Sequence, residues 1–206
     1  MTPAIQELRE FKKLTLGEVN RSPAIHRSVA GKGPNVARVL RQVGGHPLLL
    51  GFVGSEFITT NLRRQGVAEK MVRTKEPTRV CTTLMDHATG TITELVEEAT
   101  LPTASEWRQF FATFRRCLPQ ARYVVIAGAL MPGAAPEIYR KLARGGVPVI
   151  IDSQREPLLG VLEFKPLIAK LNVHELENTL GKVEPIAGAR ELLRRGRDAQ
   201  GQHLGR

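Results

Sequence analysis

Cysteine and aromatic residues are scarce in this sequence. Its 206 residues include 2 cysteines, and aromatic residues make up 5% of the total. Cys81 and Cys117 lie far apart and show neither the C-x-x-C spacing nor the histidine clustering of zinc and redox sites. Few aromatics also weaken a nucleic-acid interpretation, because single-strand binders stack bases on aromatic rings. We therefore expect two reduced, structural thiols.

Long apolar runs are missing as well. The first 13 residues contain no apolar segment of the signal-peptide type. No uninterrupted apolar stretch approaches the ~20 residues that a membrane-spanning helix needs. The sequence therefore predicts a cytoplasmic protein with no membrane partner.

Acidic residues are outnumbered by basic ones. The chain has 30 lysines and arginines against 20 aspartates and glutamates, so its formal net charge is +10. The basic residues are spread along amphipathic segments, a pattern that favours a pocket for phosphorylated small molecules over a nucleic-acid surface. A basic nucleic-acid-associated protein remains open as an alternative.

The order of apolar patterns predicts an α/β fold. We expect helices over 36–44, 59–65, 105–118, 136–143 and 187–195, and strands over 47–53, 123–127, 147–151 and 166–171. A hairpin is expected over 78–98, around a turn that ends at Gly90. Continuous apolar strands that alternate with helices indicate a mostly parallel sheet covered by helices.

A glycine-rich loop precedes the first expected helix. Gly31 and Gly33 allow a ligand to approach the backbone closely, and Asn35 offers an amide to hydroxyl groups at the helix start. Lys32 adds a positive charge, but no Ser or Thr follows it, so the loop is not a Walker A motif. By itself the loop is equally typical of a plain surface turn.

Seven motifs follow one another in an order that resembles the ribokinase-like (PfkB) carbohydrate kinases. They are LGEVNR at 16–21, AGKGPNVARVL at 30–40, GFVG at 51–54, TR at 78–79, GALMPG at 128–133, IDS at 151–153 and KLNVHEL at 170–176. The similarity runs from residue 2 to about 195 and is closest to the branch of 1-phosphofructokinase and tagatose-6-phosphate kinase. It implies a three-layer sandwich with a small β lid over about 16–30 and 78–98.

The resemblance also implies where substrates bind. Gly31, Lys32, Gly33 and Asn35 match the loop that holds the sugar. Arg79 matches the position that binds the phosphate already on the substrate, a role that suits the two parallel hydrogen bonds of a guanidinium. The other interpretation of Arg79 is a solvated charge on a strand.

A second group of residues matches the family's N-x-x-E motif. Asn172 and Glu175 correspond to the element that orders Mg²⁺ and the phosphates of ATP, with Glu175 acting on the metal through water. Lys170 is expected to neutralise phosphate charge. From the residues alone, Asn172 and Glu175 also fit a helix cap with glutamate at its third position.

The sequence departs from the family at both ends. Gln6 stands where the family carries an aspartate that binds sugar hydroxyls, so its contacts are expected to be weaker. The Gly-Ala-Gly-Asp motif, which supplies the catalytic base, does not occur in these residues. We therefore expect a partial kinase domain over 1–195, an irregular tail over 196–206, and no catalytic residue.

Together these features predict a sugar-phosphate kinase by descent. Its intact relatives would use ATP and Mg²⁺ to phosphorylate a hydroxyl of a ketohexose phosphate of the fructose 1-phosphate or tagatose 6-phosphate type. The chain itself is expected to be inactive or impaired, and a non-catalytic remnant that binds sugar phosphate is the alternative. A homodimer formed through the β lid is a further expectation.

Overall fold

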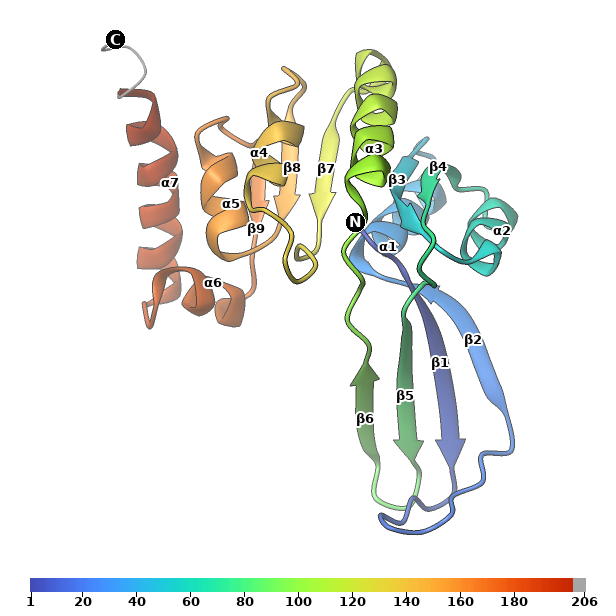
Figure 1. Cartoon of the computed structure of the whole chain (residues 1–206). Coiled ribbons are helices and arrows are strands. Elements are labelled where there is room, and N and C mark those ends of the chain that lie inside the picture. The colour runs from blue at the N-terminus through green and yellow to red at the C-terminus, as the bar shows by residue number, and fades with distance from the viewer. Residues whose placement is uncertain (202–206) are drawn as a thin grey trace. The chain divides into compact units, whose positions relative to one another are not determined.

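A computed structural model of the chain describes the backbone of residues 1–201 and the side chains of residues 1–196. The chain divides into two compact units, Met1–Phe110 and Phe111–Arg206, and the division falls within helix α3 (Ala104–Cys117). Both units combine helices with strands, so the predicted α/β class is confirmed (Figure 1).

A four-stranded sheet extends from the rest of the first unit (Figure 1). We call it the lid sheet, and its strand order is β2 (Ile25–Ala30), β1 (Ala4–Phe11), β5 (Val80–Asp86) and β6 (Thr91–Val96). The outer pairs are antiparallel, whereas β1 and β5 are parallel. The predicted hairpin is present as β5 and β6. Strand β1 was not predicted. Its charged residues lie on both faces of the strand, so the alternation of apolar and polar residues that marks a strand is not evident in the sequence.

The remainder of the first unit packs two helices against a pair of parallel strands. These elements are α1 (Lys32–Gln42), β3 (Leu48–Val53), α2 (Glu56–Arg64) and β4 (Ala68–Arg73). Their core consists of buried aliphatic side chains, namely Val29, Ala37, Val53, Ile58, Leu62 and Val67. Helix α2 begins where the Ser55 hydroxyl accepts a hydrogen bond from the Phe57 amide at 3.3 Å.

The second unit contains a three-stranded parallel sheet in the order β7 (Val124–Ala127), β8 (Val149–Asp152), β9 (Ile168–Lys170). A 3₁₀ turn (Leu118–Gln120) precedes β7, and the helices are α4 (Glu137–Ala143), α5 (Arg155–Leu162), α6 (Val173–Leu180) and α7 (Pro185–Gly201). Ile151 of β8 and Tyr139 of α4 are fully buried. This sheet has the parallel pairing that its apolar strands predicted.

Several boundaries differ from the sequence-based expectation. Helix α1 begins at Lys32 rather than 36, because Pro34 is compatible with a first helical turn, where its missing N–H is not needed. Helix α5 was not predicted, since Pro157 and Gly160 lower its propensity.

The irregular tail predicted over 196–206 is also corrected. Helix α7 continues to Gly201, as residues with adequate helix propensity extend it, and residues 202–206 lie outside the described part of the chain. Over the described residues, no helix has the length and apolarity needed to cross a bilayer.

Candidate functional site

A pocket of about 80 Å³ lies in the first unit, where the lid sheet joins the β3–β4 layer. It is lined by residues from four segments, namely Thr2 and Pro3, Phe52 and Gly54, Thr74 to Arg79, and Ala99 to Thr103 with Glu106. The segments follow the carboxyl ends of β3 and β4 and flank the lid strands β1, β5 and β6. Ligand sites of α/β folds are typically found at this edge.

The linker from β4 to β5, residues 74–79, is held by a series of hydrogen bonds. The Thr74 amide donates to the Val53 carbonyl at 2.9 Å, and the Gly54 amide donates to the Thr78 hydroxyl at 2.9 Å. A Cβ atom on Gly54 would lie 1.9 Å from the Glu76 carbonyl oxygen, so only glycine permits this approach. The linker therefore passes directly against the end of β3.

Arg79 ends this linker and lines the pocket. One of its terminal nitrogens, Nη1, donates to the Glu97 carbonyl at 3.2 Å, while its backbone carbonyl accepts from the Ile5 amide at 3.0 Å. The Nε atom of Arg79 is buried and has no hydrogen-bond partner among the described residues. An unpaired buried donor is costly, so this nitrogen favours an acceptor in the pocket.

The glycine-rich loop lies next to the pocket wall. Gly31 has a φ of 115°, and a Cβ atom there would meet the Pro3 Cα at 3.3 Å. Lys32, Gly33 and Asn35 form the first turn of α1, and the Asn35 amide donates to the Gly31 carbonyl at 3.0 Å. None of these four loop residues lines the pocket itself.

Two expected sugar-binding side chains make contacts within the protein. The side-chain oxygen Oδ1 of Asn35 accepts a hydrogen bond from the Arg38 guanidinium of the same helix. The Gln6 side chain donates to the Thr83 hydroxyl at 2.8 Å across the lid sheet. Binding of a ligand hydroxyl by either of these groups would therefore require it to give up its present partner.

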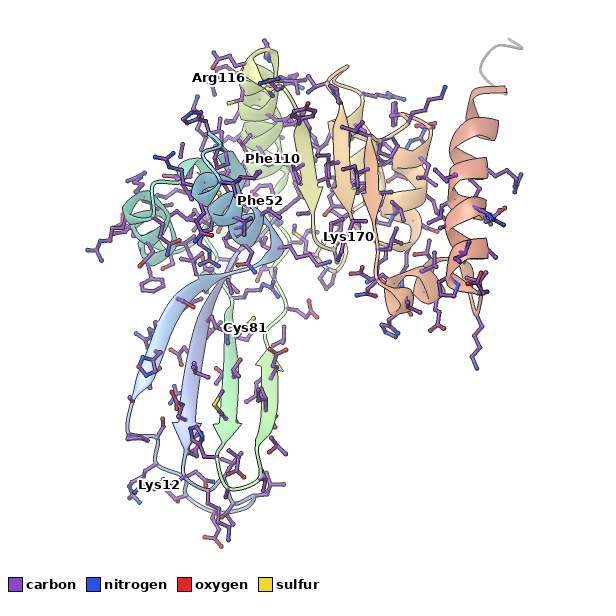
Figure 2. All side chains as sticks on the ribbon, turned by 180° about the vertical axis from the view of Figure 1, so that it is seen from behind. Lys12, Phe52, Cys81, Phe110, Arg116 and Lys170 are labelled. Carbon is purple, nitrogen blue, oxygen red and sulfur yellow. The ribbon has the colours of Figure 1, made fainter. Side chains whose placement is uncertain are left out.

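The second unit gathers charged residues where β8 and β9 end. The Lys170 ammonium lies 3.3 Å from a carboxylate oxygen of Asp152 and 3.9 Å from one of Glu175 (Lys170 is labelled in Figure 2). Asn172 and Glu175 form a reciprocal capping box at the start of α6, with hydrogen bonds of 2.7 and 2.9 Å. The helix-cap interpretation of Asn172 and Glu175 is thus confirmed, and Asp152 joins the group.

The carboxylates of Asp152 and Glu175 are of the type that could bind a hydrated Mg²⁺. Carboxylate oxygens with water molecules are the ligands that this ion prefers. In the part of the chain that the structure describes, no cluster of three or more histidine, cysteine or acidic side chains has metal-binding geometry. The Asp152 and Glu175 carboxylates both lie near Lys170, and contact of Glu175 with a metal through water stays a prediction.

A buried tyrosine supports the loop that follows β7. The Tyr139 hydroxyl donates to the Gly128 carbonyl at 2.7 Å, and the Gly128 amide donates to the Asp152 carbonyl at 2.9 Å. Burial, with a smaller contribution from the charge of Asp152, raises the pKa of Tyr139, so it remains a donor. Sequence analysis missed Tyr139, because an aromatic on an amphipathic helix is usually a core residue.

Comparison with known proteins agrees with the fold and with these motifs. A model of the pfkB family of carbohydrate kinases matches residues 3–203. The tetrameric inhibited form of phosphofructokinase-2 from Escherichia coli superposes with a TM-score of 0.84 at 23% identity, over 95% of this chain and 68% of that one.

Two further solved structures are similar. The same Escherichia coli enzyme in complex with fructose-6-phosphate gives a TM-score of 0.83 at 22% identity, over 95% of this chain and 69% of that one. A Thermotoga maritima protein named as a possible 1-phosphofructokinase gives 0.82 at 21% identity, over 97% and 67%.

The match over nearly all described residues identifies the class of protein. The chain belongs to the pfkB family of carbohydrate kinases. It spans about two thirds of the length of the solved structures that it resembles. The ribokinase-like fold and the family that the sequence motifs predicted are confirmed.

Proposed function

We propose that this chain binds the phosphate of a ketohexose phosphate in the pocket that Arg79 lines. The observation that carries the proposal is the buried Arg79 Nε, which lacks a hydrogen-bond partner among the described residues. A phosphate oxygen would complete the hydrogen bonding of the guanidinium, and arginine donates two parallel bonds to such groups. The sugar would then extend toward Gly31, whose backbone adjoins Pro3 of the pocket wall.

In this proposal the second unit contributes to the nucleotide side of the family's reaction. Lys170 would face phosphate oxygens of ATP, while Asp152 and Glu175 would hold water molecules around Mg²⁺. When bound, that ion neutralises phosphate charge during transfer to a sugar hydroxyl. Asn172 would keep Glu175 oriented through the capping box, because each side chain accepts from the other's backbone amide.

The 206 residues by themselves are proposed to bind substrate without turning it over. They contain no Gly-Ala-Gly-Asp motif. In the family that the sequence resembles, this motif supplies the base that takes the proton from the attacking hydroxyl. Loss of a general base alone slows a reaction by roughly 10²- to 10⁴-fold. The second candidate function is that of a remnant of a kinase whose role is sugar-phosphate binding alone. It would use the same Arg79 pocket.

Calorimetric titration tests the proposal. Fructose 1-phosphate, fructose 6-phosphate and tagatose 6-phosphate are titrated into the chain and into Arg79→Ala. We expect at least one of them to bind and the variant to lose most of that affinity. Binding of none of the three, or equal binding by the variant, would reject the proposal.

We also propose that the lid sheet associates with a second copy of the chain. Ile92 and Val96 of β6 are 61% and 56% exposed, and the strand register places both on one face beside Met85 and Cys81. Such a face favours burial against another protein surface. Sedimentation of Ile92→Asp should show fewer dimers than the wild type, and an unchanged distribution would contradict a lid-mediated dimer.

A further inference from the structure

Glu106 connects the start of helix α3 to the linker that carries Arg79. Its side chain is 8% exposed and lines the same pocket as Arg79. One carboxylate oxygen, Oε2, accepts from the Thr103 amide at 2.6 Å and from the Thr103 hydroxyl at 2.9 Å. The other, Oε1, accepts from the Lys75 amide at 3.1 Å. A single carboxylate thus bridges two segments that are 28 residues apart in sequence (103 − 75).

The first of these contacts is an ordinary helix cap. Thr103 precedes α3, and its hydroxyl accepts from the Glu106 amide at 3.3 Å, which completes the capping box. A cap alone requires only the contacts with Thr103. The bond from the Lys75 amide is additional, since Lys75 belongs to the β4–β5 linker and not to the helix.

The electrostatic surroundings keep Glu106 ionised. The hydrogen bond from the Thr103 backbone is the main cause that lowers the pKa of Glu106, and the Thr103 hydroxyl and the Lys75 amide lower it further. Both oxygens accept hydrogen bonds, which stabilise the charged form of the carboxylate. Because the carboxylate keeps its negative charge, attraction for an anion in this pocket must come from Lys75 and Arg79, which line it as well.

The bond to Lys75 bears on Arg79 because the linker between them is short and fixed. The Thr74 hydroxyl donates to the Glu76 carbonyl at 2.9 Å, and Thr78 accepts from the Gly54 amide. Among the hydrogen bonds of the linker named here, the one to Glu106 attaches it to α3. Without the bond from Lys75, the linker would keep its attachments at Thr74 and Thr78 but would lose its contact with Glu106 of α3. Even small displacements of binding groups weaken ligand contacts strongly.

We propose that Glu106 is a positioning residue for the phosphate site: its carboxylate ties the β4–β5 linker to the start of α3 and so holds Arg79 in the pocket. The proposal rests on the proposed function for the role of Arg79 in binding phosphate. It goes beyond that function by assigning the geometry of the site to a residue that would not touch the ligand.

Two substitutions test separately the charge of Glu106 and the length of its side chain. Glu106→Gln keeps the length but replaces one of the two acceptor oxygens by an NH₂ group, which faces either the Thr103 donors or the Lys75 amide. Glu106→Asp keeps the charge but is one methylene shorter, so it cannot span from Thr103 to Lys75. Glu184→Gln is the matched control, because Glu184 accepts from the Ile186 and Ala187 amides at the start of α7 and has no link to Arg79.

The first measurement needs no ligand. Hydrogen exchange of the Arg79 Nε–H, followed by nuclear magnetic resonance, reports how well this buried nitrogen is held. We expect faster exchange in both Glu106 variants and no change in Glu184→Gln. Unchanged exchange in Glu106→Gln and Glu106→Asp, in proteins with a native near-ultraviolet circular dichroism spectrum, would overturn the proposal.

The second measurement is calorimetric titration with fructose 6-phosphate. Both Glu106 variants should bind about tenfold more weakly, the expected consequence of one impaired charge-assisted contact. Full affinity in Glu106→Asp would show that charge alone matters and would overturn the positioning role. If Arg79→Ala binds as well as the wild type, the proposed function fails, and the exchange measurement still decides the role of Glu106.

Discussion

The Tyr139 hydroxyl lies 2.7 Å from the Gly128 carbonyl oxygen, and the tyrosine side chain is fully buried. This contact joins helix α4 to the end of strand β7, where the GALMPG motif begins. Gly128 has a φ of 97°, a conformation that side chains disfavour. The tyrosine hydroxyl therefore stabilises a turn in which the backbone conformation of residue 128 favours glycine.

Tyr139→Phe should lower the free energy of unfolding by about 1–3 kcal/mol, because it leaves the Gly128 carbonyl without its donor while the ring still fills the core. Urea denaturation measures the change. Tyr123→Phe is the control, since Tyr123 is 51% exposed, and it should alter stability by less than about 0.5 kcal/mol. Equal effects in the two variants would contradict the importance of this hydrogen bond.

Arg79→Ala should reduce sugar-phosphate affinity more than Lys32→Ala does. Arg79 lines the pocket and can grip phosphate through two bonds, whereas Lys32 is an exposed residue of the loop beside it. We expect a loss of roughly 10- to 100-fold for arginine and a few-fold for lysine. Calorimetry on the two variants gives the order, and equal losses would reject it.

The 206-residue chain should show no ATP-dependent turnover of fructose 1-phosphate, fructose 6-phosphate or tagatose 6-phosphate. The reason is the absence of the Gly-Ala-Gly-Asp motif from these residues. A coupled assay of ADP release makes the measurement. Turnover at or above ~1 s⁻¹, within the ordinary range of enzymes, would show that another group supplies the base.

Strand β9 should promote self-association. It pairs with β8 and has no second partner among the described strands, and Leu167 and Ile168 are 59% and 50% exposed. An unpaired edge with apolar side chains is a site of association, and a lysine on such an edge opposes it. Light scattering should therefore decrease for Ile168→Lys. Leu16→Lys, which adds the same charge to the lid, is the control and should leave the β9-dependent scattering unchanged.

Acid should weaken helix α7 through Glu191. Hydrogen bonds from Arg194, then from Arg195, lower the pKa of Glu191 from its ordinary 4.5 to about 2. Because the folded pKa is depressed, this stabilisation is present above pH 4.5 and is lost as the pH falls toward 2. The Glu191 side chain is 32% exposed, so solvent screening keeps the effect small.

Titration of the Glu191 carboxyl carbon by nuclear magnetic resonance checks this value. Arg194→Ala with Arg195→Ala should return the pKa toward 4.5. Arg190→Ala removes a charge from a neighbouring position that projects from another side of the helix, and it should change the pKa much less. A similar rise in the double variant and in Arg190→Ala would indicate a general charge effect rather than these two ion pairs.

The amino-acid sequence by itself determined the family, the α/β class and most elements. A continuous apolar run such as 147–151 is typical of a buried strand when helices alternate with it, and ordered motifs are far more specific than single ones. The capping box of Asn172 and Glu175 was also evident, because it depends on residues three positions apart.

Only the tertiary structure decided which distant residues share a site. Strand β1 became the centre of the lid sheet through pairing with β2 and β5, and charged residues hid its alternation in the sequence. The link from Glu106 to Lys75 joins segments far apart in the chain, although a threonine three residues before a glutamate predicts only a cap. Hydrogen bonds across such separations depend on how the chain folds back on itself. Local sequence patterns do not predict which distant segments are brought together.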